Sequence, residues 1–147
     1  MTIADEYMLQ AIHLAFDGMR HNRGGPFGAV IVKNDTVIGR GCNQVTSSND
    51  PTAHAEMVAI RQASATISNF CLSGAVLYTS CEPCPMCAMA CVWAGVSRIY
   101  FGASIDDAAE FGNQVKIYCR EIAEKAWYEL QVEGGLLREE CRELFRG

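Results

Sequence analysis

Two short apolar segments joined by a two-residue turn limit the possible folds of this sequence more than any other feature. Residues 27–33 (FGAVIVK) and 36–42 (TVIGRGC) flank Asn34-Asp35, and a polar two-residue connection of this kind predicts a β-hairpin. Three further apolar stretches are predicted strands: 75–79, 97–102 and 127–132. A hairpin followed by strands that alternate with helices predicts a five-stranded mixed sheet with helices on both faces, a three-layer α/β/α sandwich.

Helical spacing of apolar residues predicts the elements that cover this sheet. The expected helices are residues 5–20, 51–64, 85–94, 115–125 and 136–145, with a loop or short helical turn over 104–112. Asp50 is expected to cap the second helix, with Pro51 at its first position. The 147 residues contain no repeat or long linker, so residues 1–147 are expected to form a single domain. Functional sites in such sheets lie beyond the strand ends, where helices begin.

Charge and composition exclude several classes of protein. The net charge of −5 argues against a nucleic-acid partner, because polyanions are usually bound by basic surfaces. The longest apolar run, 87–96, is half the length of roughly 20 residues that a membrane span needs. The first ten residues carry acids and no basic flank, so no signal peptide and a cytoplasmic location are expected. Eight cysteines then indicate reduced thiols, some of them metal ligands, rather than a disulfide scaffold.

Four of the eight cysteines lie in residues 79–91 (TSCEPCPMCAMAC), with the spacing C-x2-C-x2-C-x3-C. This spacing matches an iron–sulfur run, but Val92 stands where proline is usual and the chain has no second cysteine run. Cys84 and Cys87 are three residues apart at the start of a predicted helix. Both can therefore project to one point, where the helix N-terminus favours thiolates. Cys91, one turn further along, is expected in the core.

A zinc site needs a third protein ligand and, if it is to activate water, an open fourth position. His54 is the candidate, and Glu56 follows it at a spacing that turns the two side chains about 200° apart in a regular helix. His54 and Glu56 can therefore serve one metal site only if the metal lies beyond the N-terminus of the helix. H-x-E with P-C-x-x-C starting 27 residues after Glu56 matches the zinc deaminase signature, in which the glutamate transfers protons. Cys81 as a fourth ligand would instead give a structural zinc module.

These residues resemble the cytidine deaminase-like zinc hydrolases through His54-Ala55-Glu56 and the segment 83–87 (PCPMC), and the resemblance covers nearly the whole chain. GGPFGAVIVK, DPTAHAE and LYTSCEPCPMC are similar to the branch that holds the guanine, cytosine and tRNA adenosine deaminases. Similarity to the bacterial guanine deaminases implies hydrolysis of guanine to xanthine and ammonia by a zinc-dependent homodimer. It also implies that Asn43 hydrogen-bonds the base and that Phe27 and Trp93 line the base pocket.

One segment departs from that family pattern. Guanine deaminases of this branch usually carry an acidic pair shortly after the Asp-Ala-Ala segment, whereas residues 112–115 (GNQV) hold no carboxylate. Asp106, Asp107 and Glu110 are the candidates to replace it. Guanine is accordingly the first expected substrate and cytosine, or a related aminated heterocycle, the second. A tRNA adenosine substrate ranks third, because the C-terminal arginines alternate with glutamates instead of forming a basic helix.

Overall fold

The computed structural model describes residues 1–147, and a five-stranded sheet with the order β2-β1-β3-β4-β5 lies at its centre. The strands are β1 (Gly28–Lys33), β2 (Thr36–Cys42), β3 (Val76–Cys81), β4 (Arg98–Ala103) and β5 (Gln131–Glu133). β1 is antiparallel to both of its neighbours, β2 and β3, whereas β3, β4 and β5 are parallel. The mixed sheet predicted from the hairpin is therefore confirmed, with the 75–79 strand at its middle.

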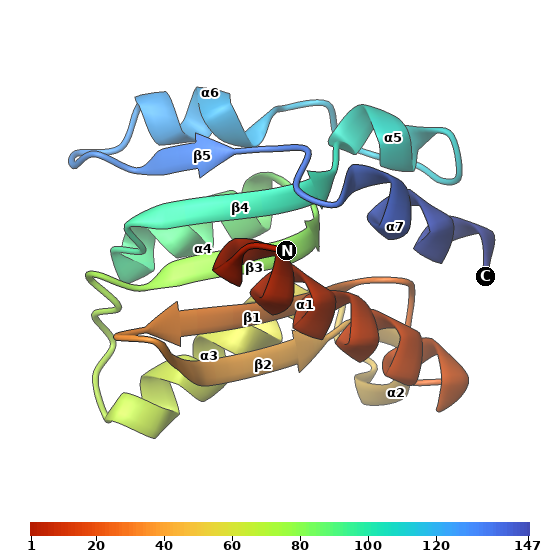
Figure 1. Cartoon of the computed structure of the whole chain (residues 1–147), viewed down its shortest axis with the longest axis horizontal. Helices are drawn as coiled ribbons and strands as arrows, with labels where there is room; N and C mark the ends of the chain where they lie inside the picture. Colours follow the sequence, from red (N-terminus) through yellow and green to blue (C-terminus); the bar gives the residue numbers. More distant parts are fainter.

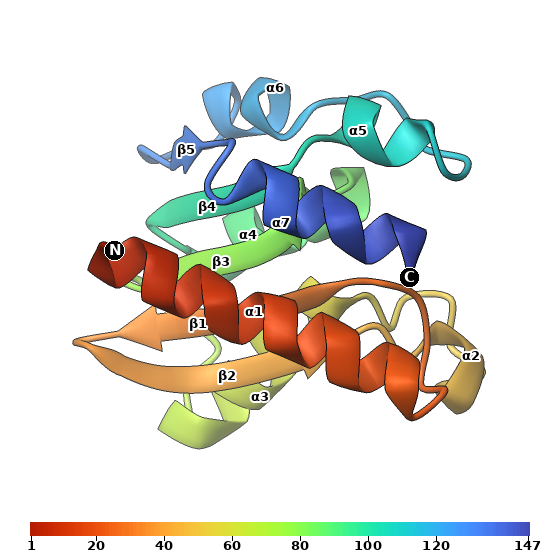
Figure 2. The ribbon, with the colours of Figure 1, turned by 45° about the vertical axis from the view of Figure 1, so that its right-hand side comes forward.

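Helices cover both faces of the sheet, which confirms the three-layer arrangement (Figures 1 and 2). One face carries α1 (Ile3–Arg20) and α7 (Arg138–Glu143), and the other carries α3 (Ala55–Ile67), α4 (Pro85–Ala94) and α6 (Cys119–Glu124). The remaining helical turns are α2 (Val45–Ser48), α5 (Ile105–Ala109) and the 3₁₀ turn η1 (Leu144–Arg146). None of the helices is both long and apolar enough to cross a lipid bilayer.

The hairpin sets the direction in which the neighbouring strands run. Asn34 and Asp35 both have positive φ, 50° and 59°, as a type I′ two-residue turn requires. The pairing register runs from Gly28 opposite Cys42 to Lys33 opposite Thr36. Because β1 is antiparallel to both neighbours, β2 and β3 run the same way and end at the same edge of the sheet.

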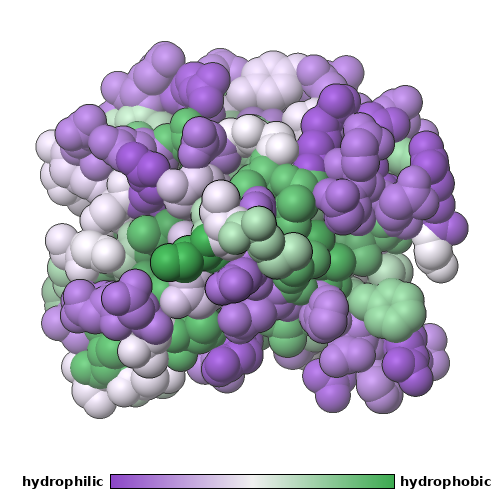
Figure 3. All heavy atoms as spheres, viewed as in Figure 1, coloured by the Kyte–Doolittle hydropathy of each residue, from purple (hydrophilic) through white to green (hydrophobic).

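Close packing of α1 against β1 depends on a glycine. A Cβ atom at Gly28 would lie 2.0 Å from the carbonyl oxygen of Ala11, so only glycine allows the helix to approach the strand this closely. Met8 and Ala15 are fully buried on the same side of α1. The surface of this face also carries hydrophobic residues in its middle, between α1 and α7 (Figure 3). The larger core cluster, with 18 buried residues, includes side chains of α3, α4 and α6 on the opposite face.

The second predicted helix starts later than expected. α3 begins at Ala55, and His54 is its N-cap in extended backbone, with φ −67° and ψ 155°. Asp50 does not cap this helix, so that prediction is wrong. Its Oδ1 instead accepts hydrogen bonds from the Thr52 backbone N–H (2.9 Å) and the Thr52 hydroxyl (2.7 Å). Aspartate next to proline forms a local turn of this kind in competition with a helix start.

Two C-terminal predictions are longer than the elements observed. The helix expected over 115–125 spans only α6, and the strand expected over 127–132 overlaps β5 only at its end. Tyr128 accounts for the shorter strand, because its hydroxyl donates a 2.7 Å hydrogen bond to the carbonyl of Val96, which lies between α4 and β4. The side chain is thus turned toward α4 and away from the edge of the sheet.

A buried carboxylate joins α5 to α7. Asp107 is 4% exposed, and it accepts hydrogen bonds from Arg138 Nε (2.9 Å) and Nη2 (2.7 Å) and from Arg142 Nη1 (2.5 Å). The backbone N–H of Ser104 donates a further bond to it (2.9 Å). The hydrogen-bonded Arg138 guanidinium holds the pKa of Asp107 well below its usual range. The C-terminal helix is therefore attached to α5 by charged hydrogen bonds as well as by apolar packing.

We expect Asp107→Asn to lower the free energy of unfolding by about 2–3 kcal/mol at pH 7, because hydrogen bonds to a charged acceptor are lost. The folded-state pKa of Asp107 is depressed, so its contribution is complete above the unfolded-state value of about 3.9 and declines as the pH falls toward the folded-state value. Urea unfolding at pH 7 and pH 3 measures this, and the difference between the two proteins should shrink at pH 3.

Glu143→Gln is the matched control, since Glu143 forms an exposed ion pair with Arg146 beside the same helix. It should change stability by less than about 0.5 kcal/mol at either pH. An Asp107→Asn effect of equal size at both pH values would contradict the assignment of the stabilisation to the ionised carboxylate.

Candidate active site

Two helix N-termini meet at one edge of the sheet. α3 follows β2 and α4 follows β3, and these two strands end on either side of β1. His54 is the N-cap of α3, and Cys84 is the N-cap of α4 in similar extended backbone. Cys87 lies in the first turn of α4, as Pro85 at the first helical position predicts. Side chains some thirty residues apart in the sequence therefore face one another.

The three donor atoms fit a zinc ion. The Nδ1 atom of His54 lies 3.5 Å from the sulfur of Cys84 and 3.5 Å from the sulfur of Cys87. Zinc bonds of about 2.3 Å to sulfur and 2.0–2.1 Å to nitrogen, at tetrahedral angles, place such ligands about 3.6 Å apart. All three donor atoms lie within 4.8 Å of one another. One imidazole and two thiolates leave a fourth tetrahedral position free for water.

The electrostatics of the cluster favour metal binding. Hydrogen bonding with Cys87 lowers the pKa of Cys84 to about 4, and the same contact raises the pKa of Cys87. Hydrogen bonding with Cys84 raises the pKa of His54. Zinc binds thiolates and a neutral imidazole, so a metal ion at this site would displace the protons of the cluster and be held by both sulfurs.

Glu56 lies beside the three donors, at the second position of α3, and is 5% exposed. His54 precedes the helix, so the 200° separation of a regular helix does not apply to the two side chains, and both reach the same cavity. Burial raises the pKa of Glu56 to about 7. A carboxyl group with such a pKa can both accept and donate a proton near neutral pH.

A cavity of about 190 Å³ opens beside these residues. Nine residues line it: Phe27, Asn43, His54, Glu56, Cys81, Glu82, Cys84, Asn113 and Gln114. Sites for drug-sized ligands measure roughly 300–1,000 Å³, so this cavity suits a single small molecule. No lysine or arginine is among the lining residues, and phosphate groups are usually bound by such cations. A flat, uncharged ring therefore fits the cavity better than a nucleotide.

Asn43 presents a hydrogen-bond donor in this cavity. Its Oδ1 atom accepts from the backbone N–H groups of Val45 (3.1 Å) and Gly25 (3.4 Å), which leaves the amide N–H₂ group for a ligand. The neighbouring chain approaches so closely that a Cβ atom at Gly24 would lie 2.4 Å from this oxygen. Phe27 adds an aromatic wall to the same cavity. The structure thus brings Asn43 and Phe27 together with the metal-binding cluster.

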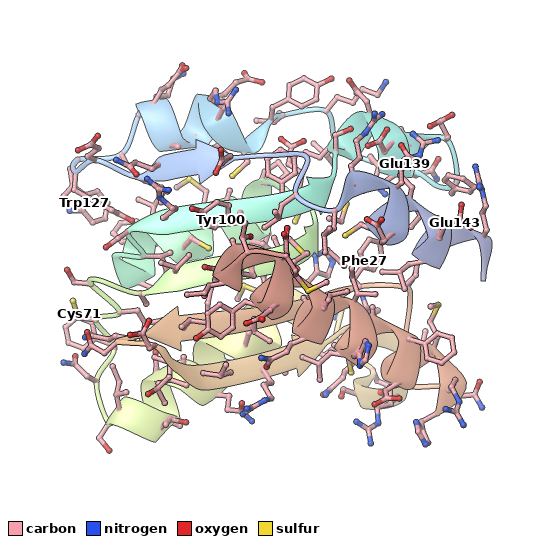
Figure 4. The ribbon with its side chains drawn as sticks, viewed as in Figure 1. Phe27, Cys71, Tyr100, Trp127, Glu139 and Glu143 are labelled. Atoms are coloured by element: carbon pink, nitrogen blue, oxygen red, sulfur yellow. The ribbon has the colours of Figure 1, made fainter.

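Trp93, expected to line the base pocket, is not among the residues that line the cavity of its own chain. The side chain is 70% exposed in the last turn of α4, about 13 Å along the helix from Cys84. Its ring centroid lies 5.4 Å from that of Trp127. Figure 4 labels Trp127 at the left edge of the molecule and Phe27 to the right of its centre, so the tryptophan pair lies away from the cavity.

None of the three acids expected to replace the missing acidic pair lines the cavity. Asp107 accepts hydrogen bonds from Arg138 and Arg142 of α7, and Glu110 forms a 3.1 Å ion pair with Arg142. Asp106 accepts a 2.8 Å hydrogen bond from the Tyr118 hydroxyl. These carboxylates therefore hold the C-terminal third of the chain together instead of facing a ligand.

Three lining residues have no ligand role in the sequence predictions, Glu82, Asn113 and Gln114, and Cys81 has one only in the structural-zinc alternative. Glu82 could have been predicted as a lining residue from its position between the end of β3 and Cys84. Asn113 and Gln114 lie between α5 and α6 without regular structure, so no periodicity in the sequence predicts where their side chains point. Cys81 does not belong to the donor cluster; its thiol lies 3.9 Å from the Ser104 carbonyl. A fourth protein ligand, which a structural zinc module needs, is therefore not supplied.

Comparison with known proteins gives a consistent result. The model of the cytidine and deoxycytidylate deaminase zinc-binding region matches residues 1–103. Guanine deaminase of Bacillus subtilis is 46% identical over 122 residues, which cover 83% of this chain and 78% of that protein. A tRNA-specific adenosine deaminase of Buchnera aphidicola is 36% identical over 81% of this chain and 76% of its own.

Solved structures extend the likeness to the C-terminal third. Guanine deaminase from Nitrosomonas europaea superimposes with a TM-score of 0.86, covering 99% of this chain and 84% of that one, at 27% identity. The crystal structure of the Bacillus subtilis guanine deaminase gives a TM-score of 0.73 at 48% identity, covering 76% of this chain and 71% of that one.

The donor cluster predicts which cysteines a metal requires. We expect Cys84→Ala to lose bound zinc, because the remaining imidazole and single thiolate form an incomplete site. Cys91→Ala should keep about one zinc per chain, since Cys91 is fully buried in the core cluster and lies outside the donor group. Metal analysis of the purified variants measures both contents. A zinc-free Cys91→Ala protein that remains folded would revive the four-cysteine alternative.

Proposed function

The chain belongs to the cytidine and deoxycytidylate deaminase zinc-binding family, and from this premise we propose that it hydrolyses guanine to xanthine and ammonia. The observation that carries the proposal is the meeting of His54, Cys84 and Cys87 with the buried carboxyl group of Glu56 at a small cavity without cationic side chains. We further propose that residues 1–147 act as one deaminase domain, in the cytoplasm, where its free thiols stay reduced.

Glu56 carries the protons of this reaction. His54, Cys84 and Cys87 would hold a zinc ion, which when bound would supply an activated water. Glu56 accepts a proton from this water as the oxygen attacks the ring carbon that bears the amino group. It then delivers protons to the adjacent ring nitrogen and to the departing amine, so that water and guanine give xanthine and ammonia. Glu56 is buried in the cavity beside the donor cluster, so it can exchange protons with both the attacking water and the base.

Recognition of the base falls to neutral side chains. The free amide N–H₂ group of Asn43 donates to a ring acceptor, and Phe27 packs on the flat face of the ring. Asn113 and Gln114 take the place of the acidic pair, and their amides can both donate to and accept from the edge of guanine. The 46% identity to the Bacillus subtilis guanine deaminase supports guanine as the first choice. Cytosine or a related aminated heterocycle is the alternative for the same cavity.

A tRNA substrate is the competing proposal, because the family also includes tRNA-specific adenosine deaminases at 36% identity. The net charge of −5 opposes it, since RNA binding relies on neutralised phosphates. A screen of ammonia release from guanine, cytosine, adenine, their nucleosides and a tRNA anticodon arm separates these substrates. Turnover of the tRNA substrate alone would reverse the order.

We propose that two chains associate through the outer surface of α4. Met89, Trp93 and Trp127 are 43%, 70% and 68% exposed, and the two tryptophan rings lie against each other. Aromatic residues and methionine are enriched at protein interfaces relative to the rest of the surface. A second copy of this chain is the expected occupant of this surface.

Glu56→Gln should keep about one zinc per chain, because Glu56 is not a ligand, and lower kcat for guanine by about 10²–10⁴-fold, the contribution of a positioned proton carrier. Metal analysis and an ammonia-release assay measure the two effects. Glu124→Gln, an exposed site on α6, is the control and should match the wild type. Turnover retained in Glu56→Gln would end the proposed mechanism.

The dimer predicts a mass of about two 16.1 kDa chains in solution. Trp93→Lys should give the mass of one chain, because a charge in the centre of the interface has no partner. Size-exclusion chromatography with light scattering measures the mass. Phe16→Lys is the control, since Phe16 is also a large exposed apolar residue (52%) but lies on α1. A wild-type protein with the mass of one chain would refute the association.

A further inference from the structure

One wall of the cavity is formed by a long connection without regular structure. Asn113 and Gln114 lie in the segment 110–118, which joins the end of α5 to the start of α6. The backbone hydrogen bonds of this segment are local and stay between residues 107 and 121. Its position relative to the metal-binding cluster therefore depends on side chains that attach its two flanking helices to the rest of the protein.

Glu82 makes the buried attachment. One carboxylate oxygen accepts a hydrogen bond from the backbone N–H of Ile105, the first residue of α5 (3.0 Å). The other oxygen accepts from the backbone N–H of Cys119, the first residue of α6 (2.9 Å). Both ends of the 105–119 stretch are thereby held by one side chain that is only 7% exposed.

The ion pairs made by residues 110–118 themselves are exposed to solvent. Lys116 lies 3.7 Å from Asp106, and both side chains are about 60% exposed. Glu110, which pairs with Arg142, is 57% exposed. Exposed ion pairs contribute little because solvent competes for both partners, whereas a buried carboxylate that accepts two N–H groups is both shielded and charge-assisted. The buried Asp107 holds α5 to α7, whereas Glu82 is the buried carboxylate that binds the first residues of both α5 and α6.

Glu82 also sits in the segment that fixes the metal ligands. It is two residues before Cys84, and Pro83 between them is fully buried. Its own backbone N–H donates a 2.7 Å hydrogen bond to the Ala103 carbonyl at the end of β4. The carboxylate that holds the 110–118 wall and the thiolate that holds the metal thus project from one rigid stretch of chain.

We propose that Glu82 is a positioning residue for substrate recognition: it sets the distance between the Asn113–Gln114 wall and the metal-binding cluster. The inference rests on the proposed function in that the ligand held between the wall and the metal is the base. It goes beyond that function by assigning the spacing of the two halves of the pocket to one carboxylate that contacts neither the metal nor the reacting atoms.

Glu82→Gln tests this, because the amide group retains one acceptor and turns a donor toward the other backbone N–H. We expect about one zinc per chain, kcat for guanine within about 3-fold of the wild type, and KM raised by about 10-fold, the effect of one lost buried hydrogen bond. Hydrogen exchange of residues 105–119 should become faster. A merely structural role would lower the melting temperature without separating KM from kcat.

Glu121→Gln is the matched control. Glu121 accepts a hydrogen bond from the backbone N–H of Tyr118 at the same helix start (3.0 Å), but it is exposed and does not line the cavity. It should leave zinc, KM and exchange at wild-type values. In a Gln114→Ala background, Glu82→Gln should add little to KM, because both changes remove the same contact.

The proposal is overturned if Glu82→Gln shows wild-type KM and wild-type exchange, if it loses zinc, or if its effect on KM adds fully to that of Gln114→Ala. Should Glu82→Gln fail to fold, Glu82→Asp is measured in the same way, since it keeps the charge but shortens the reach by about 1.5 Å. If the wild type does not deaminate guanine, the proposed function fails, and zinc content and exchange still decide the role of Glu82.

Discussion

For an imidazole and two thiolates to share one metal ion, two helix N-termini must meet within a few ångströms, and the arrangement of the sheet follows from this requirement. The strands that lead into α3 and α4 lie on either side of β1 and run in the same direction. Neighbouring strands in a sheet are about 4.8 Å apart, so β2 and β3 end roughly two such spacings apart at the same edge. The segment 43–54, which includes α2, then brings the start of α3 next to that of α4. An antiparallel β1 between β2 and β3 produces this geometry, and the Asn34-Asp35 turn produces the antiparallel β1.

The sequence predicts those parts of the fold that periodicity and turn chemistry control. The hairpin, the central strand and the helix that begins at Pro85 lie where apolar patterning and proline place them. The start of α3 is different, because Asp50 offers two competing local structures and the structure contains the turn. The 115–118 segment is not helical although its composition permits a helix. The helix α6 starts at Cys119, whose backbone N–H donates to the carboxylate of Glu82. No local sequence pattern indicates a contact between residues so far apart in the chain.

The residues of the site likewise differ in whether the sequence could predict their positions. His54, Cys84 and Cys87 could be predicted because their spacing and the prolines before them determine where the side chains point. Trp93 could not be placed by family position alone, since one helix carries residues at the cavity and residues far from it. Asp107 shows a related ambiguity, because a carboxylate in a loop can face a ligand or an arginine. The charge pattern Arg138-x-x-x-Arg142 on a later helix is the only feature of the sequence that hints at its partner.

The irregular segment 110–118 has an evolutionary consequence. The residues proposed to carry the chemistry lie at the N-caps or in the first turns of α3 and α4. Asn113 and Gln114, which line the other side of the cavity, lie in a loop that makes only local backbone hydrogen bonds. Loops tolerate substitution better than the elements they connect. New substrates can therefore arise by sequence drift at a few loop positions while the hydrolytic machinery is inherited unchanged, and a family built on this plan can diversify its specificity without rebuilding its catalyst.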